Sequence, residues 1–229
     1  MKVVICWSLL MFSVSAFAGI QVDATRVIYN GGNQSSSLSL KNDSEDTYMV
    51  QTWLDIGDST QNPKGLPIVV TPPILKLASK KEAVLRFIYS GQGLPQDKES
   101  VFWVNVQEIP PAPKVENVLQ VAIRTRVKLF YRPAALKIDL QQQAQALKWQ
   151  RQGNEVVVSN NGPAHITLGV LRFANRGQIS CSVEGDMLEP QGVQRIALPA
   201  TCGNASELTF TFINDYGGHT EIKEIRLNP

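Results

Sequence analysis

The sequence contains little of what a metal centre or a catalytic site requires. Its 229 residues include three cysteines and two histidines, too few for a zinc site built from several thiolate and imidazole ligands. It lacks a G-x-S-x-G nucleophile elbow, an H-E-x-x-H pair and a phosphate-binding loop. His165 and His219 have no partner motif, which favours structural or solvated roles, and Asp55 and Asp58 lie beside turn residues, where carboxylates ordinarily cap turns. We therefore expect a protein that is not an enzyme and needs no cofactor or metal.

An excess of charge of either sign is also missing. The 22 lysines and arginines face 20 aspartates and glutamates, for a formal net charge of +2. This balance gives no strong field to steer nucleic acid, so composition offers no case for a nucleic-acid partner. At 43% hydrophobic and 18% charged residues, the chain has enough apolar material for a packed core and too little charge for a disordered protein.

A long apolar run is found at the N-terminus and nowhere else in the sequence. Lys2 precedes the run VVICWSLLMFSVS, and the A-x-A pattern of residues 16–18 closes it, as in a secretory signal peptide. The run is shorter than the roughly 20 residues that a helix needs to cross a bilayer, which disfavours a membrane anchor. We predict that residues 1–18 are a signal peptide and that the mature chain begins at Gly19, is exported and does not insert into a membrane.

Export changes the meaning of the few cysteines. Cys6 is removed with the signal peptide, which leaves Cys181 and Cys202 in the mature chain. An even pair in an exported protein suggests a disulfide, and the alternative is two buried free thiols. In the chain-entropy model the bridge would stabilise the fold by about 3 kcal/mol.

The dominant hydrophobic period along the mature chain is two rather than 3.6, which indicates strands. The apolar runs alternate with turn clusters rich in Gly, Asn and Pro. They are residues 21–29, 35–42, 48–56, 67–77, 83–89, 100–109, 119–131, 155–160, 165–174, 194–200 and 208–214. Many short strands at this spacing predict antiparallel sandwiches, each of about 100 residues, so that the chain accommodates two.

The polar stretch after Pro133 is the expected domain boundary, because proline stops a strand ladder. We predict a first domain over 19–137 and a second over 138–229. The segment LQQQAQALKWQ, residues 140–150, is the one helix candidate. It lacks a recognisable capping signal, so a strand near residues 147–149 is an equal alternative.

Three segments carry more specific patterns than alternation. They are LPQDKESVFWVNVQEIPP at 94–111, NVLQVAIRTRVKLFYRP at 117–133 and INDYGG at 213–218. Together with TRVIY at 25–29 and TPP at 71–73, these segments resemble the periplasmic pilus (fimbrial) chaperones of the chaperone–usher pathway. The resemblance covers nearly the whole mature chain. The short loop over residues 110–117 is similar to that of the short-loop branch of the family.

The resemblance implies an all-β protein of two immunoglobulin-like β-sandwich domains arranged as an L, without enzymatic activity. It implies that the protein works in the periplasm, where it would bind, fold and stabilise pilus subunits and deliver them to an outer-membrane usher. By residue match, Arg26 and Lys128 would anchor the C-terminal carboxylate of the subunit, with Thr25 beside them. A chain-terminal carboxylate is an acceptor, and two cations can give it charge-assisted hydrogen bonds.

The same residue match implies an interdomain ion network of Glu108, Arg132 and Asp215. Charges in the angle between two domains would fix their orientation more than they add stability. Segment 161–168 matches the family loosely, so we assign no subunit-binding role to it.

Segment 117–131 has two interpretations. Its alternation alone favours a core face that includes Leu119, Val121 and Ile123, whereas the resemblance makes these three residues a donor stripe that completes the fold of the subunit. Lys128 falls on the opposite face, so a twist or a bulge would be needed to bring both to one ligand. An exposed apolar edge is an aggregation hazard. We therefore expect the free protein to cover the donor stripe by self-association or with the loop over 110–117.

Two other classes of protein remain as alternatives. A two-domain adhesin or pilus subunit would carry its own donor strand and lack the Arg26–Lys128 pair, which this sequence has. A secreted hydrolase on a β scaffold would need a nucleophile and a base, and the sequence offers no such set.

Overall fold

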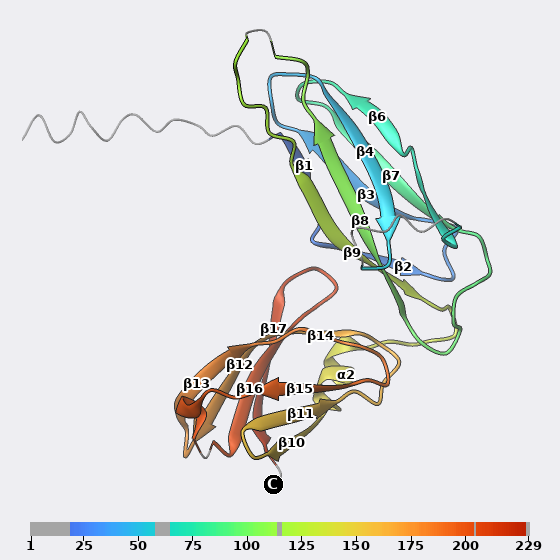
Figure 1. The fold of residues 1–229 in the computed structure, drawn as a ribbon. Coiled ribbons are helices and arrows are strands. Elements are labelled where there is room, and N and C mark those ends of the chain that lie inside the picture. The colour runs from blue at the N-terminus through green and yellow to red at the C-terminus, as the bar shows by residue number, and fades with distance from the viewer. Residues whose placement is uncertain (1–18, 58–64, 114–115, 204, 228–229) are drawn as a thin grey trace, which may run out of the picture.

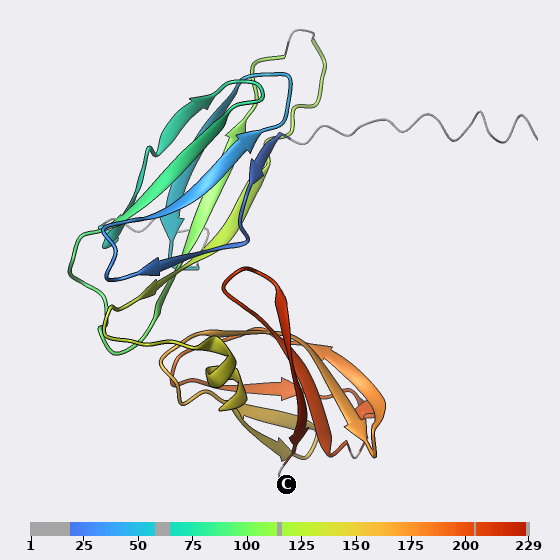
Figure 2. The same ribbon diagram turned by 180° about the vertical axis from the view of Figure 1, so that it is seen from behind.

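The protein consists of two β-sandwiches that meet at an angle and give the molecule the shape of an L (Figure 1). The computed structural model describes residues 19–57, 65–113, 116–203 and 205–227. The second sandwich lies across one end of the first, as the view from behind also shows (Figure 2). The predicted signal peptide and Asp58 lie outside the described residues. Among the described residues, no helix is both long and apolar enough to cross a membrane.

The first sandwich packs a four-stranded sheet against a five-stranded sheet. In spatial order, the four-stranded sheet contains β1 (Ile20–Val22), β3 (Ser36–Asn42), β7 (Glu82–Tyr89) and β5 (Ile68–Thr71). The five-stranded sheet contains β2 (Arg26–Asn30), β9 (Arg124–Arg132), β8 (Ser100–Ile109), β4 (Tyr48–Asp55) and β6 (Ile74–Leu77). Alternate side chains of both sheets point inward and are buried, among them Leu40, Phe87, Val104 and Leu129. This period of two is the alternation that the sequence shows.

Strand β9 has two different neighbours. Along one edge it pairs antiparallel with β8, from Arg124 opposite Gln107 to Tyr131 opposite Ser100. Along the other edge it pairs parallel with β2, which covers β9 from Lys128 to Arg132. Among the described residues, the edge of β9 from Arg124 to Val127 therefore has no strand partner on the β2 side.

The second sandwich follows the same plan with fewer strands. In spatial order, one sheet contains β10 (Lys148–Gln152), β11 (Glu155–Ser159) and β15 (Val193–Ala197). The other contains β13 (Gln178–Glu184), β12 (Ile166–Asn175), β16 (Glu207–Ile213) and β17 (His219–Arg226), and β14 (Met187–Leu188) pairs with β12. Its core includes Phe173, Phe210 and Phe212. The hairpin between β16 and β17 projects toward the first sandwich in both ribbon views (Figures 1 and 2).

A disulfide joins Cys181 on β13 to Cys202, which lies in a short 3₁₀ helix, η2 (Ala200–Cys202), with their Cα atoms 5.0 Å apart. The predicted bridge is confirmed, and the alternative of two free thiols is wrong. Because η2 follows β15 in one sheet and β13 belongs to the other, the bridge ties the two layers of the second sandwich together.

The segment over residues 140–150 contains a helix as well as a strand. Helix α2 (Leu140–Gln145) ends shortly before β10 begins at Lys148. The expectation that it has no capping signal is wrong, because the Asp139 carboxylate accepts hydrogen bonds from the N–H groups of Gln141 and Gln142, at 2.9 and 3.1 Å. An aspartate at this position satisfies N–H groups that the first turn of a helix leaves free.

The all-β class and the two-domain L arrangement are confirmed by this fold. The predicted limit at 137/138 falls between β9 and α2, and the limits of the two domains stay predictions. Three strands were not expected from the alternation, namely β13, β14 and β17, whereas β10 agrees with the strand near residues 147–149 that the sequence left as an alternative.

Candidate functional site

Arg26 and Lys128 stand side by side on two adjacent strands. Arg26 is the first residue of β2, and the register of the parallel pair sets it opposite Lys128 on β9. Neighbouring strands lie about 5 Å apart, so both side chains rise from the same patch of the sheet. Val127 and Leu129 point into the core; the two cations therefore lie on the outer face, which is turned toward the second domain.

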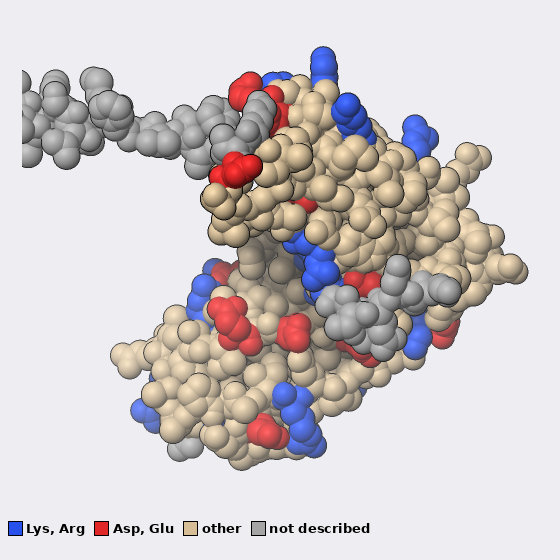
Figure 3. Space-filling view, turned by 45° about the horizontal axis from the view of Figure 1, so that its top comes forward, with Lys and Arg blue, Asp and Glu red and all other residues tan. Residues whose placement is uncertain are grey.

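This cation pair lies where the two domains meet. The Arg26 Nη1 atom donates a hydrogen bond of 3.0 Å to the carbonyl oxygen of Ile213, at the end of β16 in the second domain. Figure 3 shows the hollow between the domains, with lysine and arginine atoms exposed in it. Because their side chains are half-buried there, both cations lose part of their hydration.

The electrostatics of the pair favour an anionic ligand. Burial lowers the pKa of Lys128, Asp186 of the second domain raises it, and the charge of Arg26 lowers it further. Burial is also the main cause that lowers the pKa of Arg26. Within the described part of the chain, neither cation forms an ion pair. A carboxylate placed between them would relieve both effects, since an opposite charge favours the charged form of each group.

Thr25 precedes β2 and faces the turn between β16 and β17. Gly217 in this turn has a φ of 82°, and a side chain added there would collide with the Thr25 hydroxyl. Glycine is required for both reasons, because it accepts the left-handed conformation and allows the close approach. The structure therefore brings Thr25, Arg26 and Lys128 to one place, as the sequence predicts, and leaves their role as a carboxylate anchor a prediction.

The donor stripe of Leu119, Val121 and Ile123 is open to solvent. These side chains are 91%, 62% and 55% exposed, whereas Val127 on the same strand is 5% exposed. The core interpretation is therefore wrong for the stripe and right for Val127 and the inward residues that follow. Since the stripe is exposed, the described part of the loop over 110–117 does not cover it.

Two prolines explain why strand pairing stops before the donor stripe. The ladder between β8 and β9 continues through one more bond, from the Glu108 N–H to the carbonyl oxygen of Ile123, at 3.0 Å. The next residues on the β8 side, after Ile109, are Pro110 and Pro111, which have no N–H to donate. The stripe therefore extends the line of β9 without belonging to a sheet.

The register of β8 and β9 contains no bulge from Arg124 to Tyr131. The donor stripe therefore has the same parity as Val127, on the face opposite Lys128. A bulge is ruled out as the device that would bring the stripe and Lys128 to one side. Strand twist is the alternative that the sequence left open.

The interdomain ion network is built around Arg132, the last residue of β9. Its Nη1 and Nη2 atoms donate to the two carboxylate oxygens of Asp215, both at 2.6 Å, and its Nε donates to Glu99 at 2.7 Å. Hydrogen bonds and charges from Asp215 and Glu99 outweigh burial and raise the pKa of Arg132. Asp215 belongs to the second domain, so this two-pronged pair crosses the interface.

The assignment of Glu108 to this network is wrong. Glu108 lies near the far end of β8, where its carboxylate accepts a hydrogen bond from the N–H of Ile20, at 2.8 Å. Glu99 takes its place, because it sits immediately before β8 and next to the end of β9 where Arg132 lies. The two glutamates are nine positions apart, which corresponds to about 30 Å along an extended strand.

Glu99 also reaches the second domain through His165. Its carboxylate accepts from the backbone N–H of His165 at 2.8 Å and lies 2.9 Å from the ring Nδ1. The His165 ring packs against Phe130 of the first domain. Neither residue was assigned to the site from the sequence. The sequence did offer one signal for Glu99, because this glutamate stands directly before the strand that begins at Ser100, inside the motif over residues 94–111.

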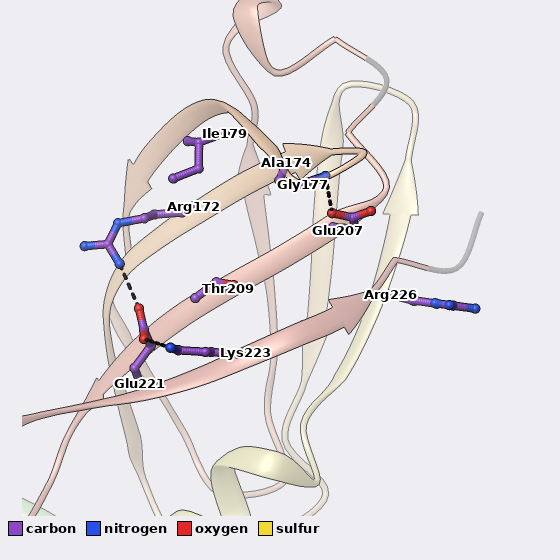
Figure 4. Close-up of a pocket in the computed structure, with 9 residues that line it drawn as sticks. All are labelled: Arg172, Ala174, Gly177, Ile179, Glu207, Thr209, Glu221, Lys223 and Arg226. Atoms are coloured by element: carbon purple, nitrogen blue, oxygen red, sulfur yellow. Dashed lines mark hydrogen bonds and ion pairs between the residues drawn. The ribbon is translucent and has the colours of Figure 1, made fainter.

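Another hollow of the described surface lies away from these residues. It lies on the outer face of the sheet formed by β12, β13, β16 and β17 (Figure 4). Three of its charged side chains pair with one another, since Glu221 contacts Arg172 at 3.1 Å and Lys223 at 3.3 Å, and Glu207 accepts a hydrogen bond from the Gly177 N–H. The described residues contain no group of three or more His, Cys, Asp or Glu side chains that could hold a metal.

Known proteins with the same features are fimbrial chaperones. Residues 19–137 match the family described as pili and flagellar-assembly chaperone, PapD N-terminal domain, and residues 142–224 match the pili assembly chaperone PapD, C-terminal domain. The chain is 39% identical to the probable fimbrial chaperone LpfB of Escherichia coli O157:H7 over 218 residues, which cover 93% of this chain and 91% of that one.

Solved structures give the same result. The chain superposes on the E. coli chaperone DraB with a TM-score of 0.77 and 31% identity, over 93% of this chain and 97% of DraB. It superposes on the SafB chaperone of Salmonella enterica, solved in complex with the SafA pilin, with a TM-score of 0.78 and 26% identity, over 94% of this chain and 99% of that one.

Proposed function

The chain belongs to the family of pili assembly chaperones, and from this we propose that it binds, folds and stabilises pilus subunits in the periplasm and delivers them to an outer-membrane usher, without enzymatic activity. The complex of the related SafB chaperone with a pilin supports a pilus subunit as the partner. The signal-peptide pattern and the Cys181–Cys202 disulfide support an oxidising compartment outside the cytoplasm.

One observation carries the proposal: an exposed apolar stripe runs without a break into a strand edge that ends at two cations, neither of which forms an ion pair with a described residue. The stripe begins at Leu119, the edge of β9 stays open from Arg124 to Val127, and the cation pair follows at Lys128. From Leu119 to Lys128 an extended chain spans about 30 Å. This length suits a strand of an incomplete subunit whose C-terminal carboxylate binds at Arg26 and Lys128.

Each part of this surface has a distinct physical role. The backbone groups of the open edge set the register of the added strand through main-chain hydrogen bonds. The side chains of the stripe fill pockets of the subunit on one face of that strand. The carboxylate fixes the position of the strand end, because a charge-assisted hydrogen bond is shorter and stronger than a neutral one.

Co-purification from periplasm tests this function. The tagged protein is expressed with its own fimbrial operon, and mass spectrometry identifies the subunit that accompanies it. We expect Arg26→Ala and Lys128→Ala to lose the subunit while they keep the wild-type melting temperature. Losing a charge-assisted bond to a desolvated carboxylate costs about 2–5 kcal/mol, or at least 30-fold in affinity.

Arg86→Ala is the matched control, because Arg86 is an exposed cation on β7, in the other sheet of the same domain. It should retain the subunit. If the two anchor variants retain as much subunit as Arg86→Ala, the proposed anchor is wrong. If no variant and no wild-type sample yields a pilus subunit, the proposed function itself is wrong.

A further inference from the structure

The indole ring of Trp103 lies against two cations of β9. Trp103 on β8 stands directly opposite Lys128 in the register, and Arg126 is the next outward residue of β9. The Lys128 ammonium is 5.1 Å from the centre of the ring, and the Arg126 guanidinium carbon is 4.6 Å from it. Both distances are within the range of a cation–π interaction.

A buried carboxylate balances one of these two cations. Asp55 on β4 stands opposite Trp103 and is fully buried, so its role extends beyond the turn capping that the sequence predicts and that its bond to the Gly57 N–H confirms. Its oxygens lie 2.9 and 3.1 Å from the Arg126 Nη2 atom, and they also accept from the Asn105 amide and the Gly57 N–H, each at 2.7 Å. The Asp55 carboxylate is therefore engaged by Arg126, Asn105 and Gly57.

The consequence is that Lys128 keeps its own charge free for a ligand. Asp55 and Arg126 compensate each other, and the charges that shift the pKa of Lys128 are those of Asp186 and Arg26. Lys128 forms no ion pair with any described residue, although a buried carboxylate lies one strand beyond Trp103. The ring of Trp103 thus occupies the position between Lys128 and Asp55 on the outer face of the sheet.

We propose that Trp103 is the positioning residue of the carboxylate anchor: its ring, fixed by the Asp55–Arg126 pair, holds the Lys128 ammonium toward the cleft and separates it from Asp55. The proposal rests on the proposed function, since it concerns the same cation pair. Lysine has a flexible four-carbon stem and a compact charge. An aromatic face that restrains this stem reduces the entropy lost when the ammonium binds a carboxylate.

Two substitutions separate an aromatic role from a space-filling one. Trp103→Phe keeps an aromatic face, whereas Trp103→Leu keeps apolar volume without one. Trp53→Leu is the matched control, because Trp53 is a half-buried indole on the outer face of the same sheet, opposite Asn105 on β8. All three proteins are compared with wild type and with Lys128→Ala by thermal melting, to establish that each is folded.

The first measurement is made on the free protein. Nuclear magnetic resonance of the Lys128 side-chain methylene groups, assigned by comparison with Lys128→Arg, reports the ring current of Trp103. We expect an upfield shift in wild type, Trp53→Leu and Trp103→Phe, and its loss in Trp103→Leu. This signal reports the position of the ammonium stem, and a purely structural role of the ring would not produce it.

The second measurement uses a synthetic peptide of the last fifteen residues of the co-purified subunit, as the free acid and as the C-terminal amide. We expect wild type to prefer the acid. Trp103→Leu should weaken acid binding about 5- to 30-fold and leave amide binding unchanged. Trp103→Phe should weaken acid binding by less than half as much on a logarithmic scale.

The outcomes distinguish the positioning role of Trp103 from the carboxylate anchor itself. Loss of acid preference in Trp103→Leu, with rescue by Trp103→Phe, supports the positioning role. If Trp103→Leu binds the acid as wild type does while Lys128→Ala does not, the anchor stands and the role of Trp103 is wrong. If Lys128→Ala keeps the full acid preference, the anchor fails, and the positioning role fails with it.

Discussion

The donor stripe can be tested by placing a charge in it. Val121→Asp and Ile123→Asp each introduce a carboxylate at a position that is more than half exposed in the free protein. Surface substitutions of this kind change stability by about 0.5 kcal/mol or less. We therefore expect both variants to be folded and to melt near the wild-type temperature.

Subunit capture should respond very differently. Full burial of one aliphatic side chain contributes about 1.5–3 kcal/mol, so the three residues of the stripe provide about 5–9 kcal/mol before ordering costs. A single aspartate removes the contribution of one aliphatic side chain and adds the cost of burying an unpaired charge. We expect the affinity for the subunit to fall by at least about tenfold.

Val127→Asp is the matched control, because Val127 has the same parity on the same segment and is 5% exposed. A charge there enters the core and should unfold the first domain. Circular dichroism melting combined with periplasmic co-purification measures both effects. If Val121→Asp or Ile123→Asp melts as low as Val127→Asp, the stripe belongs to the core. If both variants melt normally and still retain the subunit, the donor role is wrong.

Three further predictions concern the interface, the export signal and the anchor. Arg132→Ala should widen the angle between the domains in small-angle scattering and lower the melting temperature, because removing one partner of a buried pair costs about 3–5 kcal/mol; unchanged scattering and melting would contradict the network. Intact mass should show a mature chain that begins at Gly19 with Cys181 joined to Cys202, and an uncleaved chain or two alkylatable thiols would exclude the corresponding claim. A bound carboxylate should raise the pKa of Lys128, which burial lowers in the free protein. Affinity for the subunit peptide should be full below the free-state pKa and decline as pH rises through the higher pKa of the complex, whereas pH-independent calorimetric affinity over this range would refute the role of Lys128.

The sequence by itself determined the class of fold and indicated which residues form the candidate site. Period-two alternation reflects a backbone property, since successive side chains of a strand point to opposite faces. It therefore identified most strands of both sandwiches. The cysteine pair led to the disulfide, and the family resemblance, carried by residues 25–29 and the three motif segments, pointed to Arg26 and Lys128, which the parallel register of β2 and β9 makes neighbours.

The alternation of apolar residues could not tell which apolar faces are buried by the rest of the chain. Leu119, Val121 and Ile123 continue the parity of Val127, yet the first three are exposed and the last is buried. The difference arises because the β8 ladder stops at two prolines and no described strand packs over the stripe. Burial depends on what the rest of the chain places opposite a residue, which a local pattern does not contain.

Charge partners were likewise decided by tertiary structure. Glu99 and Glu108 occur in the same motif, and either could have paired with Arg132 from the sequence alone. The antiparallel register puts Ser100 opposite Tyr131, so the glutamate before Ser100 reaches Arg132 and the other lies at the far end of the strand. Asp55 became a buried partner of Arg126 for the same reason, because the register of three strands brings together residues that are 71 positions apart. Electrostatic pairing depends on distance in space, and strand order and register, which only the folded chain has, set that distance.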